Sequence, residues 1–517
     1  MHSRHRRLKR YISIPIGDMA VTAPQNGSQC RLSRPVAPTS CADGAPGLLV
    51  TARAGAGEAP RPSGAADAGA WTPARLAWYG VVVLTLAQVV SYIDRFLPSL
   101  LVGPLKSDLR LSDLQVGLLL GPAFGVLYVL MGLPIGWLAD RVNRRALLAA
   151  GVAVWCTMTA AASVVRSFVP LFTTRVGVGL GEATVAPCAV SLISDYFPRS
   201  TRSRALSVFM SGTFLGAGSA FLFGGPLVHR ITSLGPFTLG PLGELRSWQL
   251  SFLLVGTPGL LLAALLLTLR EPERRERIAQ GIALDTKGQV SLSGAIRFIA
   301  QHWRAFGLLF VGSGCTVTLG SLVLWNTALF DRTWGWSVRD VGVATGLAFF
   351  SGGPVGTALG MWLTNRWIAR GRKDATARAL LTGLALAIPG FAVYPLMPSA
   401  RLAMAAVFLA FTGQAAAAAA GPACLALIAP GQMRSQAMAI YYLVISIAGQ
   451  LLGPLPVGWM TDLFADPTKL RYAMTIEALA VGVPGVLLVR AALGSYRRHV
   501  EQLETLIDAS AGEAVHA

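Results

Sequence analysis

The sequence predicts an all-α integral membrane protein with twelve transmembrane helices in two pseudo-symmetric six-helix bundles. Of its 517 residues, 53% are hydrophobic and 13% are charged, and the mean hydropathy of +0.55 is too high for a water-soluble surface. Twelve apolar runs are long enough to cross about 30 Å of hydrocarbon. The longest connector lies between the sixth and seventh runs, so it divides the chain into two halves.

The predicted spans begin after an N-terminal tail and follow one another through short connectors. We expect a first bundle at 75–269, a connector at 270–304, a second bundle at 305–492 and a C-terminal tail at 493–517. The twelve spans are expected at 76–103, 114–137, 146–165, 168–192, 205–228, 249–269, 305–330, 340–363, 377–397, 402–428, 437–461 and 472–491.

Residues 1–74 are rich in Ala, Pro, Gly, Ser and Arg and hold too few large apolar residues to close a core, so they predict a disordered basic tail. No continuous apolar segment follows the opening MHSRHRRLKR, which argues against a cleaved signal peptide. The tail could rest on anionic headgroups, or translation could begin later, for example at Met19. The sequence leaves both alternatives open.

Basic residues set the expected orientation, because cytoplasmic connectors carry the excess of Lys and Arg. With a cytoplasmic N-terminus, the inside segments hold 32 of the 44 Lys and Arg residues and the outside loops hold 10. Both termini are therefore expected in the cytoplasm, and a bacterial chain of this kind would lie in the inner (plasma) membrane. The net charge of +19 does not indicate nucleic acid as a partner, since the basic residues are spread over short connectors.

Two short motifs recur at almost the same offset. WLADR at 137–141 matches WLTNR at 362–366, 225 residues later, and Gly225-Pro226 matches Gly453-Pro454, 228 residues later. This duplication is typical of transporters that alternate access around a site near the membrane midplane.

Five charged residues lie within the spans, away from the span ends: Asp94, Arg95, Arg175, Glu182 and Glu477. An ionised side chain near the bilayer centre costs about 2.5 to 3.5 kcal/mol on insertion scales, so charges at this depth indicate function. Four of the five fall on the first and fourth spans.

Depth decides which of these charges can meet. Asp94 and Arg175 both lie about 10 to 15 Å below the outer surface, so we expect them to pair. Arg95 points about 100° away from Asp94 around the same helix. It could face a second acceptor or extend to the outer interface. Glu477 lies near the outer end of the twelfth span and is expected at the interface.

Arg175, Gly179 and Glu182 share one stripe of the fourth span, which places Glu182 about 10 Å deeper than Arg175. Pro98 follows Asp94 by four residues and leaves the Asp94 carbonyl without a helical donor, so the helix can bend there.

A carboxylate that exchanges an arginine contact for a dry pocket can bind and release a proton. Asp94 and Glu182 are therefore candidates for proton coupling, and Arg95 and Arg175 are candidates for a gate or for substrate binding. The alternative is a static ion-pair network that holds the first and fourth spans together.

The connector GWLADRVNRR at 136–145 is similar to the signature loop of the major facilitator superfamily. Asn143 stands where that family has glycine, and asparagine tolerates left-handed backbone angles. The resemblance implies a clamp on the cytoplasmic side of the first bundle, in which Asp140 meets a helix N-terminus or a basic side chain. Its residues would be Gly136, Asp140, Arg141, Arg144 and Arg145, with an acidic partner such as Asp195 for one of the last two arginines.

The alternative to a clamp is a basic loop that only sets topology. In the second half, Asn365 replaces the acid of the motif, so any latch there is expected to be weaker.

Five further motifs resemble the Spinster branch of that superfamily, whose members are proton-linked lipid and lysolipid exporters and their bacterial relatives. The motifs are SYIDRF, RVGVGLGEA, SLISDYFP, REPERR and GQLLGPLPVGWMTD, and the resemblance covers about residues 76–492. It implies the major facilitator fold, which alternates between inward-open and outward-open states.

Uncharged polar residues of the second half could orient a ligand in the cavity between the bundles. The possible contacts are Asn326, Gln414, Tyr441 and Gln450. Hydrogen bonds within the core explain each of them equally well.

These observations predict a secondary transporter that carries out proton-coupled export of an amphiphilic organic solute, lysolipid-like by family resemblance. The alternatives are uptake of a small organic anion held by Arg95 or Arg175, and a non-transporting membrane sensor. No loop holds a nucleophile beside a base or a metal-ligand cluster, so we expect neither an enzyme nor a cofactor. The expected partners are the lipid bilayer, the solute and protons, and the chain is expected to be monomeric.

Overall fold

The computed structural model describes residues 71–238, 243–273, 292–429 and 433–516. The tail predicted at 1–74 lies outside the described residues except for its last four positions, and so does most of the connector predicted at 270–304.

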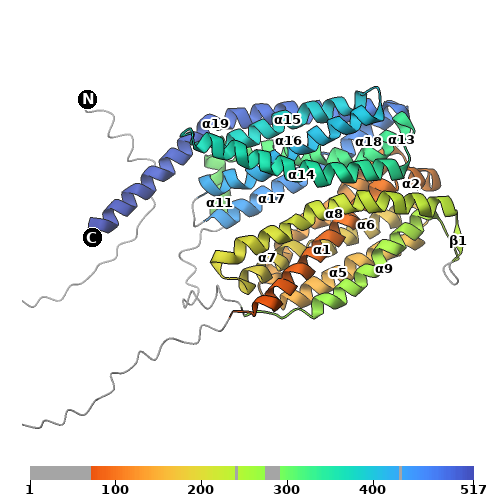
Figure 1. Cartoon of the computed structure of the whole chain (residues 1–517), viewed down its shortest axis with the longest axis horizontal. Helices are drawn as coiled ribbons and strands as arrows, with labels where there is room; N and C mark the ends of the chain where they lie inside the picture. Colours follow the sequence, from red (N-terminus) through yellow and green to blue (C-terminus); the bar gives the residue numbers. More distant parts are fainter. Residues whose placement is uncertain (1–70, 239–242, 274–291, 430–432, 517) are drawn as a thin grey trace, which may run out of the picture. The chain divides into compact units, whose positions relative to one another are not determined.

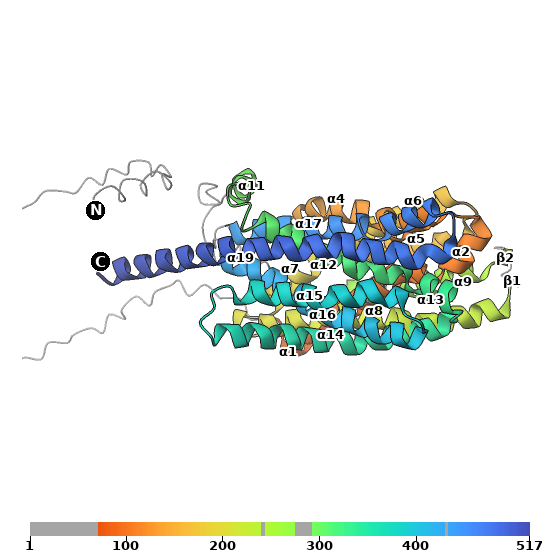
Figure 2. The same cartoon turned by 90° about the horizontal axis from the view of Figure 1, so that it is seen from above.

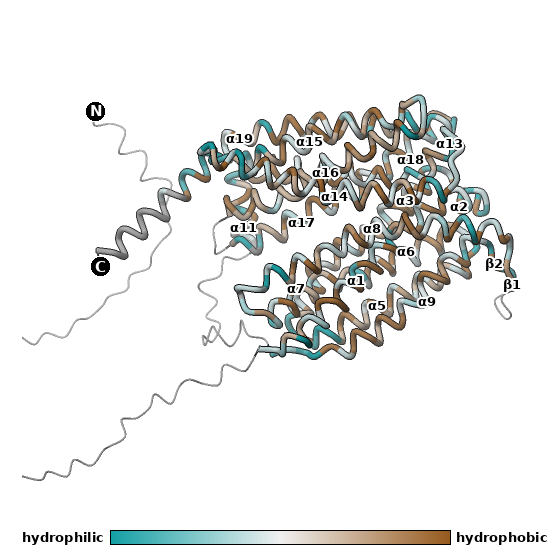
Figure 3. Tube along the Cα trace, in the orientation of Figure 1, coloured by the Kyte–Doolittle hydropathy of each residue, from teal (hydrophilic) through white to brown (hydrophobic). Residues whose placement is uncertain are grey.

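Twelve helical stretches in the described part of the chain are long and apolar enough to cross a membrane, which confirms the predicted number. Hydrophobic residues fill the lengths of these helices and hydrophilic residues gather toward their ends (Figure 3). The spans run over Ala74–Leu100, Asp113–Ala139, Arg144–Val164, Phe168–Tyr196, Ser200–Leu234, Ser247–Leu267, Gly307–Trp334, Val338–Ile368, Ala375–Leu396, Ala400–Ile428, Gln436–Leu463 and Pro467–Leu503.

The first bundle holds six of these spans, two of them built from two consecutive helices. Its helices are α1 (Ala74–Leu100), α2 (Val102–Leu109), α3 (Asp113–Leu120), α4 (Pro122–Ala139), α5 (Arg144–Ala161), α6 (Phe168–Glu182), α7 (Val185–Tyr196), α8 (Arg199–Leu234) and α9 (Ser247–Leu267). Before α9, strands β1 (Phe237–Thr238) and β2 (Glu244–Leu245) form an antiparallel pair. Helix α3 begins with a capping box, in which Ser112 and Gln115 satisfy each other's backbone N–H groups.

The second bundle repeats this plan. Its helices are α12 (Gly307–Ser321), α13 (Asn326–Trp334), α14 (Val338–Ile368), α15 (Ala375–Val393), α16 (Ala400–Ile428), α17 (Arg434–Leu451), α18 (Pro454–Leu463) and α19 (Leu470–His516), and the short α11 (Leu292–Gln301) precedes them. Helix α19 continues without a break past residue 493, where the sequence predicted a separate tail, because no further proline follows Pro484 within the helix.

The two bundles meet along α8 and α14, which lie side by side (Figures 1 and 2). Gly225 of α8 faces Gly342 of α14 so closely that a Cβ on either residue would overlap the backbone of the other helix. Gly225 therefore serves close contact between the two helices.

A second contact joins the bundles where α3 meets α18 and α4 meets α17. Both spans break at a Gly-Pro pair: α4 begins at Pro122 after Gly121, and α18 begins at Pro454 after Gly453. A Cβ at Gly121 would overlap the Gln450 carbonyl, so the two breaks lie against each other. We call the side of the membrane that holds α2, α3 and α18 the outer side, following the charge distribution of the connectors.

Candidate functional site

A cavity of about 280 Å³ lies between the two bundles. Its walls are mainly apolar, and Arg95 is the one charged residue among the described residues that line it. Gln414 and Gln450, two of the possible ligand contacts named from the sequence, also line the cavity. A space of this kind suits a solute with a large apolar part and a small polar group.

Arg95 forms an ion pair with Glu182 behind the cavity wall. Its Nη2 lies 2.8 Å from Glu182 Oε2, and the Arg95 side chain is 16% exposed whereas that of Glu182 is 0% exposed. Ser91 Oγ donates a second hydrogen bond to the same oxygen at 2.7 Å. The sequence left open whether Arg95 faces an acceptor or extends to the interface, and the structure shows the first.

Aromatic rings enclose the Arg95 guanidinium. Its carbon lies 4.8 Å from the ring centre of Tyr92, 4.4 Å from that of Phe124 and 4.9 Å from that of Tyr128. Such contacts stabilise a cation that is removed from water. The three rings therefore hold the Arg95 guanidinium in place, and the side chain still lines the cavity.

The predicted contact between Asp94 and Arg175 is present, with 3.4 Å between Arg175 Nη1 and Asp94 Oδ1. Thr159 Oγ1 donates to Asp94 Oδ2 at 2.7 Å, and both charged side chains are only 2% exposed. Arg175 Nη2 also donates to the Asp94 carbonyl at 3.4 Å, the group that Pro98 deprives of its helical donor. Arg175 is sealed from the cavity, so only Arg95 is placed for direct solute contact.

Gly179 explains how the fourth span comes close enough to bring Glu182 to Arg95. A Cβ at Gly179 would overlap the carbonyl oxygen of Phe124 in α4, so only glycine permits this approach. Glu477, which the sequence places near the interface, is 6% exposed. Packing within the second bundle covers it, which its depth along the twelfth span did not reveal.

The loop before α5 forms the expected cluster around Arg144. This buried side chain pairs with Asp195, and its Nε donates to Glu271 Oε1 at 2.8 Å. Further bonds reach Ser191 Oγ at 2.8 Å and the Pro272 carbonyl at 3.0 Å. The sequence named Asp195 as a partner and missed Glu271, which belongs to the quoted motif REPERR but was assigned no contact.

Other residues of this loop lie at its surface. Arg141 stacks on Trp137, with 3.8 Å from the guanidinium carbon to the ring centre. Asp140 and Arg141 are exposed, and Gly136 is half-buried. Arg145 extends along the end of α9, where Nη1 donates to the Leu269 carbonyl at 2.7 Å.

Asn143 does not adopt the left-handed conformation expected from the family glycine. Its φ is −65°, and its side chain accepts a hydrogen bond from the Ala146 N–H at 3.0 Å. Asparagine is a strong N-cap, so it begins α5 directly.

A set of charges on the outer side joins the two bundles and was not predicted. Asp462 of α18 accepts hydrogen bonds from the Asp113 and Leu114 N–H groups at 2.9 and 2.8 Å. Arg332 donates to both carboxylate oxygens of Asp113, at 2.8 and 3.1 Å, and Lys106 lies 2.7 Å from Asp113 Oδ1. We call Lys106, Asp113, Arg332 and Asp462 the outer latch.

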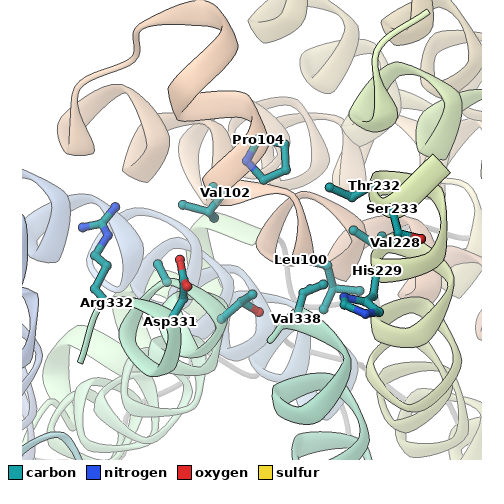
Figure 4. A pocket seen from close by; sticks show the side chains of 13 residues that line it. Leu100, Val102, Pro104, Val228, His229, Thr232, Ser233, Asp331, Arg332 and Val338 are labelled. Carbon is teal, nitrogen blue, oxygen red and sulfur yellow. The ribbon is translucent and has the colours of Figure 1, made fainter. Parts of the chain in front are cut away.

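Beside the outer latch lies a pocket of about 300 Å³. Leu100, Pro104 and His229 line it from the first bundle, and Asp331 and Arg332 from the second (Figure 4). The pocket is separate from the central cavity, since the two share no lining residue.

Two of the predicted ligand contacts lie away from the central cavity. Asn326 is buried and accepts a hydrogen bond from the Tyr394 hydroxyl at 2.9 Å. Tyr441 is buried beside Phe310. Both belong to the core of the second bundle, which was the alternative interpretation of each.

The paired bundles, the cavity between them and the Arg95–Glu182 ion pair at its wall define a membrane transporter for small solutes. A family model described as Major Facilitator Superfamily matches residues 84–328. The chain belongs to the major facilitator superfamily, in its Spinster-like branch.

The sequences of several known proteins align with more than half of this chain. It is 30% identical to an MFS-type efflux pump of Mycolicibacterium smegmatis over 82% of this chain and 95% of that protein. It is 24% identical to a probable L-galactonate transporter of Escherichia coli (65% of this chain, 72% of that one). It is 25% identical to protein spinster of Drosophila melanogaster (57% and 47%).

A solved structure shares the fold. It is a bacterial homologue of the human lysosomal transporter Spinster in an inward-facing, unoccupied conformation, with a TM-score of 0.69, 27% identity, and coverage of 83% of this chain and 98% of that one.

Proposed function

We propose that the protein exports a lysolipid-like amphiphile that carries no net charge, in exchange for protons. The observation that supports this most is the Arg95–Glu182 pair on the wall of a largely apolar cavity. The apolar walls accommodate the hydrocarbon part of such a solute, and Arg95 offers a donor for its phosphate. Both termini face the cytoplasm in this proposal, and the chain works as a monomer.

The formal charges of the cluster give the coupling its direction. Asp94, Arg95, Arg175 and Glu182 sum to zero when both carboxylates are ionised. A proton on Asp94 or Glu182 gives the cluster a charge of +1. A proton on Glu182 also removes the ionised partner that positions Arg95, so the donor for the solute phosphate is no longer held in place. The proton and the solute then exclude each other, and this is the condition for exchange.

Glu182 is the more direct proton acceptor of the two in this proposal. Its protonation breaks the bond that holds Arg95 at the wall and so alters the solute site itself. Asp94 lies behind, with Arg175, and its protonation loosens the contact between α1 and α6. We propose that this second change accompanies the opening of the outer side.

The proposal is tested in proteoliposomes with an imposed pH gradient and labelled lysophosphatidylethanolamine. We expect the lysolipid to move against the proton flux. Glu182→Gln should abolish the pH-driven component and hold lysolipid binding at the weak level of the protonated state. Glu477→Gln is the matched control, because it removes a buried carboxylate outside the cluster. Lysolipid movement in the same direction as protons, or an undiminished response in Glu182→Gln, would overturn the proposal.

A second candidate is uptake of a small organic anion together with a proton. Relatives include a hexuronate transporter and a probable galactarate/D-glucarate transporter of Bacillus subtilis, and a protonated cluster with a charge of +1 attracts an anion held by Arg95. Here Arg95→Ala should abolish binding of galactonate or glucuronate. Proton-driven uptake of these sugar acids without lysolipid flux would favour this candidate.

A further inference from the structure

We propose that a basic pocket on the side opposite the outer latch binds the phosphate of an anionic phospholipid headgroup. The pocket has a volume of about 340 Å³ and lies where the chain enters α12 and where α19 leaves the bundle. Its lining includes His302, Arg304, Ser495, Arg498 and His499. It shares no lining residue with the central cavity, so the inference is independent of the transported solute.

The charge of this pocket is positive. Arg304 and Arg498 are exposed on its rim, and no Asp or Glu is found among its described lining residues. The neighbouring Glu501 is engaged by Arg497, with 3.8 Å between Nε and Oε1. The guanidinium of Arg498 donates to Ser495 Oγ at 3.2 Å, which holds it over the pocket with donors left for an anion.

A buried imidazole forms the floor. His499 is 8% exposed, and its Nε2 has no hydrogen-bond partner within the part of the chain that the structure describes. The His499 ring lies 5.0 Å from that of His302, between centroids. A buried polar atom without a partner is costly. A headgroup hydroxyl, such as those of the glycerol in phosphatidylglycerol, can donate a hydrogen bond to Nε2 and so satisfy it.

The surroundings favour a lipid over a phosphate ion from water. Trp303, next to Arg304 in the chain, is 52% exposed, and exposed tryptophans of membrane proteins concentrate at headgroup level. Helix α11 ends beside the pocket, with Phe298 packed against Phe306 and His499. Basic pockets between helices on the cytoplasmic side are typical sites for anionic headgroups.

The test uses the purified full-length protein and native mass spectrometry with phosphatidylglycerol. The Arg304→Gln/Arg498→Gln protein should bind this lipid roughly thirtyfold more weakly, because each arginine near a headgroup contributes a factor of about five. The matched control is Arg370→Gln/Arg372→Gln, which removes two exposed arginines from the same side and should leave binding unchanged. The Arg304→Lys/Arg498→Lys protein should retain most of the binding and so reports on folding.

Two further measurements distinguish a lipid phosphate from free phosphate, and the basic pocket from the central cavity. Phosphatidylethanolamine and inorganic phosphate should bind far more weakly than phosphatidylglycerol, and Arg95→Gln should leave phosphatidylglycerol binding intact. Equal lipid binding in the Arg304→Gln/Arg498→Gln protein and in wild type would overturn the inference. So would occupation by inorganic phosphate alone, or an equal loss in the Arg370→Gln/Arg372→Gln control.

Discussion

The outer latch makes a quantitative prediction for Asp462→Ala. Asp462 supplies two acceptors to the first turn of α3, at 2.9 and 2.8 Å, although it belongs to the other bundle. Because these bonds join the two bundles, separation of the bundles on the outer side must break them. Loss of an N-terminal cap costs about 0.5 to 2 kcal/mol, so the equilibrium should shift toward outer opening by a factor of about 2 to 30.

The shift can be measured as a distance distribution between two spin labels on the outer side. Ser167→Cys in the first bundle and Arg401→Cys in the second are exposed attachment points, used in a background without other reactive cysteines. The Asp462→Ala protein should show a larger long-distance population than the parent. An unchanged distribution would refute the assignment of Asp462 to the closed state.

Asp466→Ala is the matched control, because Asp466 lies close by and bonds only within its own turn. Its carboxylate accepts from the Thr468 hydroxyl and N–H groups at 2.7 and 2.9 Å. These bonds hold the pKa of Asp466 below its usual range, so it is ionised throughout a neutral assay. Its removal should leave the distance distribution as it was.

Three further predictions concern stability and are checked by thermal or denaturant unfolding of the purified variants. Arg144→Gln should lower the free energy of unfolding by about 3 to 5 kcal/mol, because Asp195 and Glu271 lose a shared buried partner; a loss below 1 kcal/mol would contradict this. Gly342→Leu should destabilise by at least about 1 to 3 kcal/mol through overlap with Gly225, whereas an exposed leucine substitution on the same helix, Arg339→Leu, should not. Asn143→Ala should cost about 1 kcal/mol and Asn143→Asp much less, since aspartate also caps helices; equal losses in both would argue against the cap.

Hydropathy and basic-residue counts were sufficient to predict the twelve spans, because the length of a membrane crossing is fixed by the bilayer. The Asp94–Arg175 contact was predictable for a related reason. Depth along a span follows from the rise per residue, and a buried charge requires a partner at its own depth.

Contacts set by the packing of the two bundles were not predictable in this way. Asp113 and Asp462 are ordinary acidic residues at span ends, and only the meeting of α3 with α18 turns them into a latch. The capping pattern from Ser112 to Gln115 could have located the start of α3, though not its partner in the other bundle. The burial of Glu477 was not predictable for a similar reason, since depth along a span does not say which face the neighbouring helices cover.

The facing breaks at Gly121-Pro122 and Gly453-Pro454 have a mechanical consequence. At each break a short outer helix, α3 or α18, is connected to a longer inner helix, α4 or α17. The proline at the break has no backbone N–H, so one helical hydrogen bond is missing there. Helices α3 and α18 can tilt about these two hinges while α4 and α17 stay in position. The outer opening between the bundles could then widen by a few local rotations, with much less displacement of the bundles than a rigid-body rotation of each half would require.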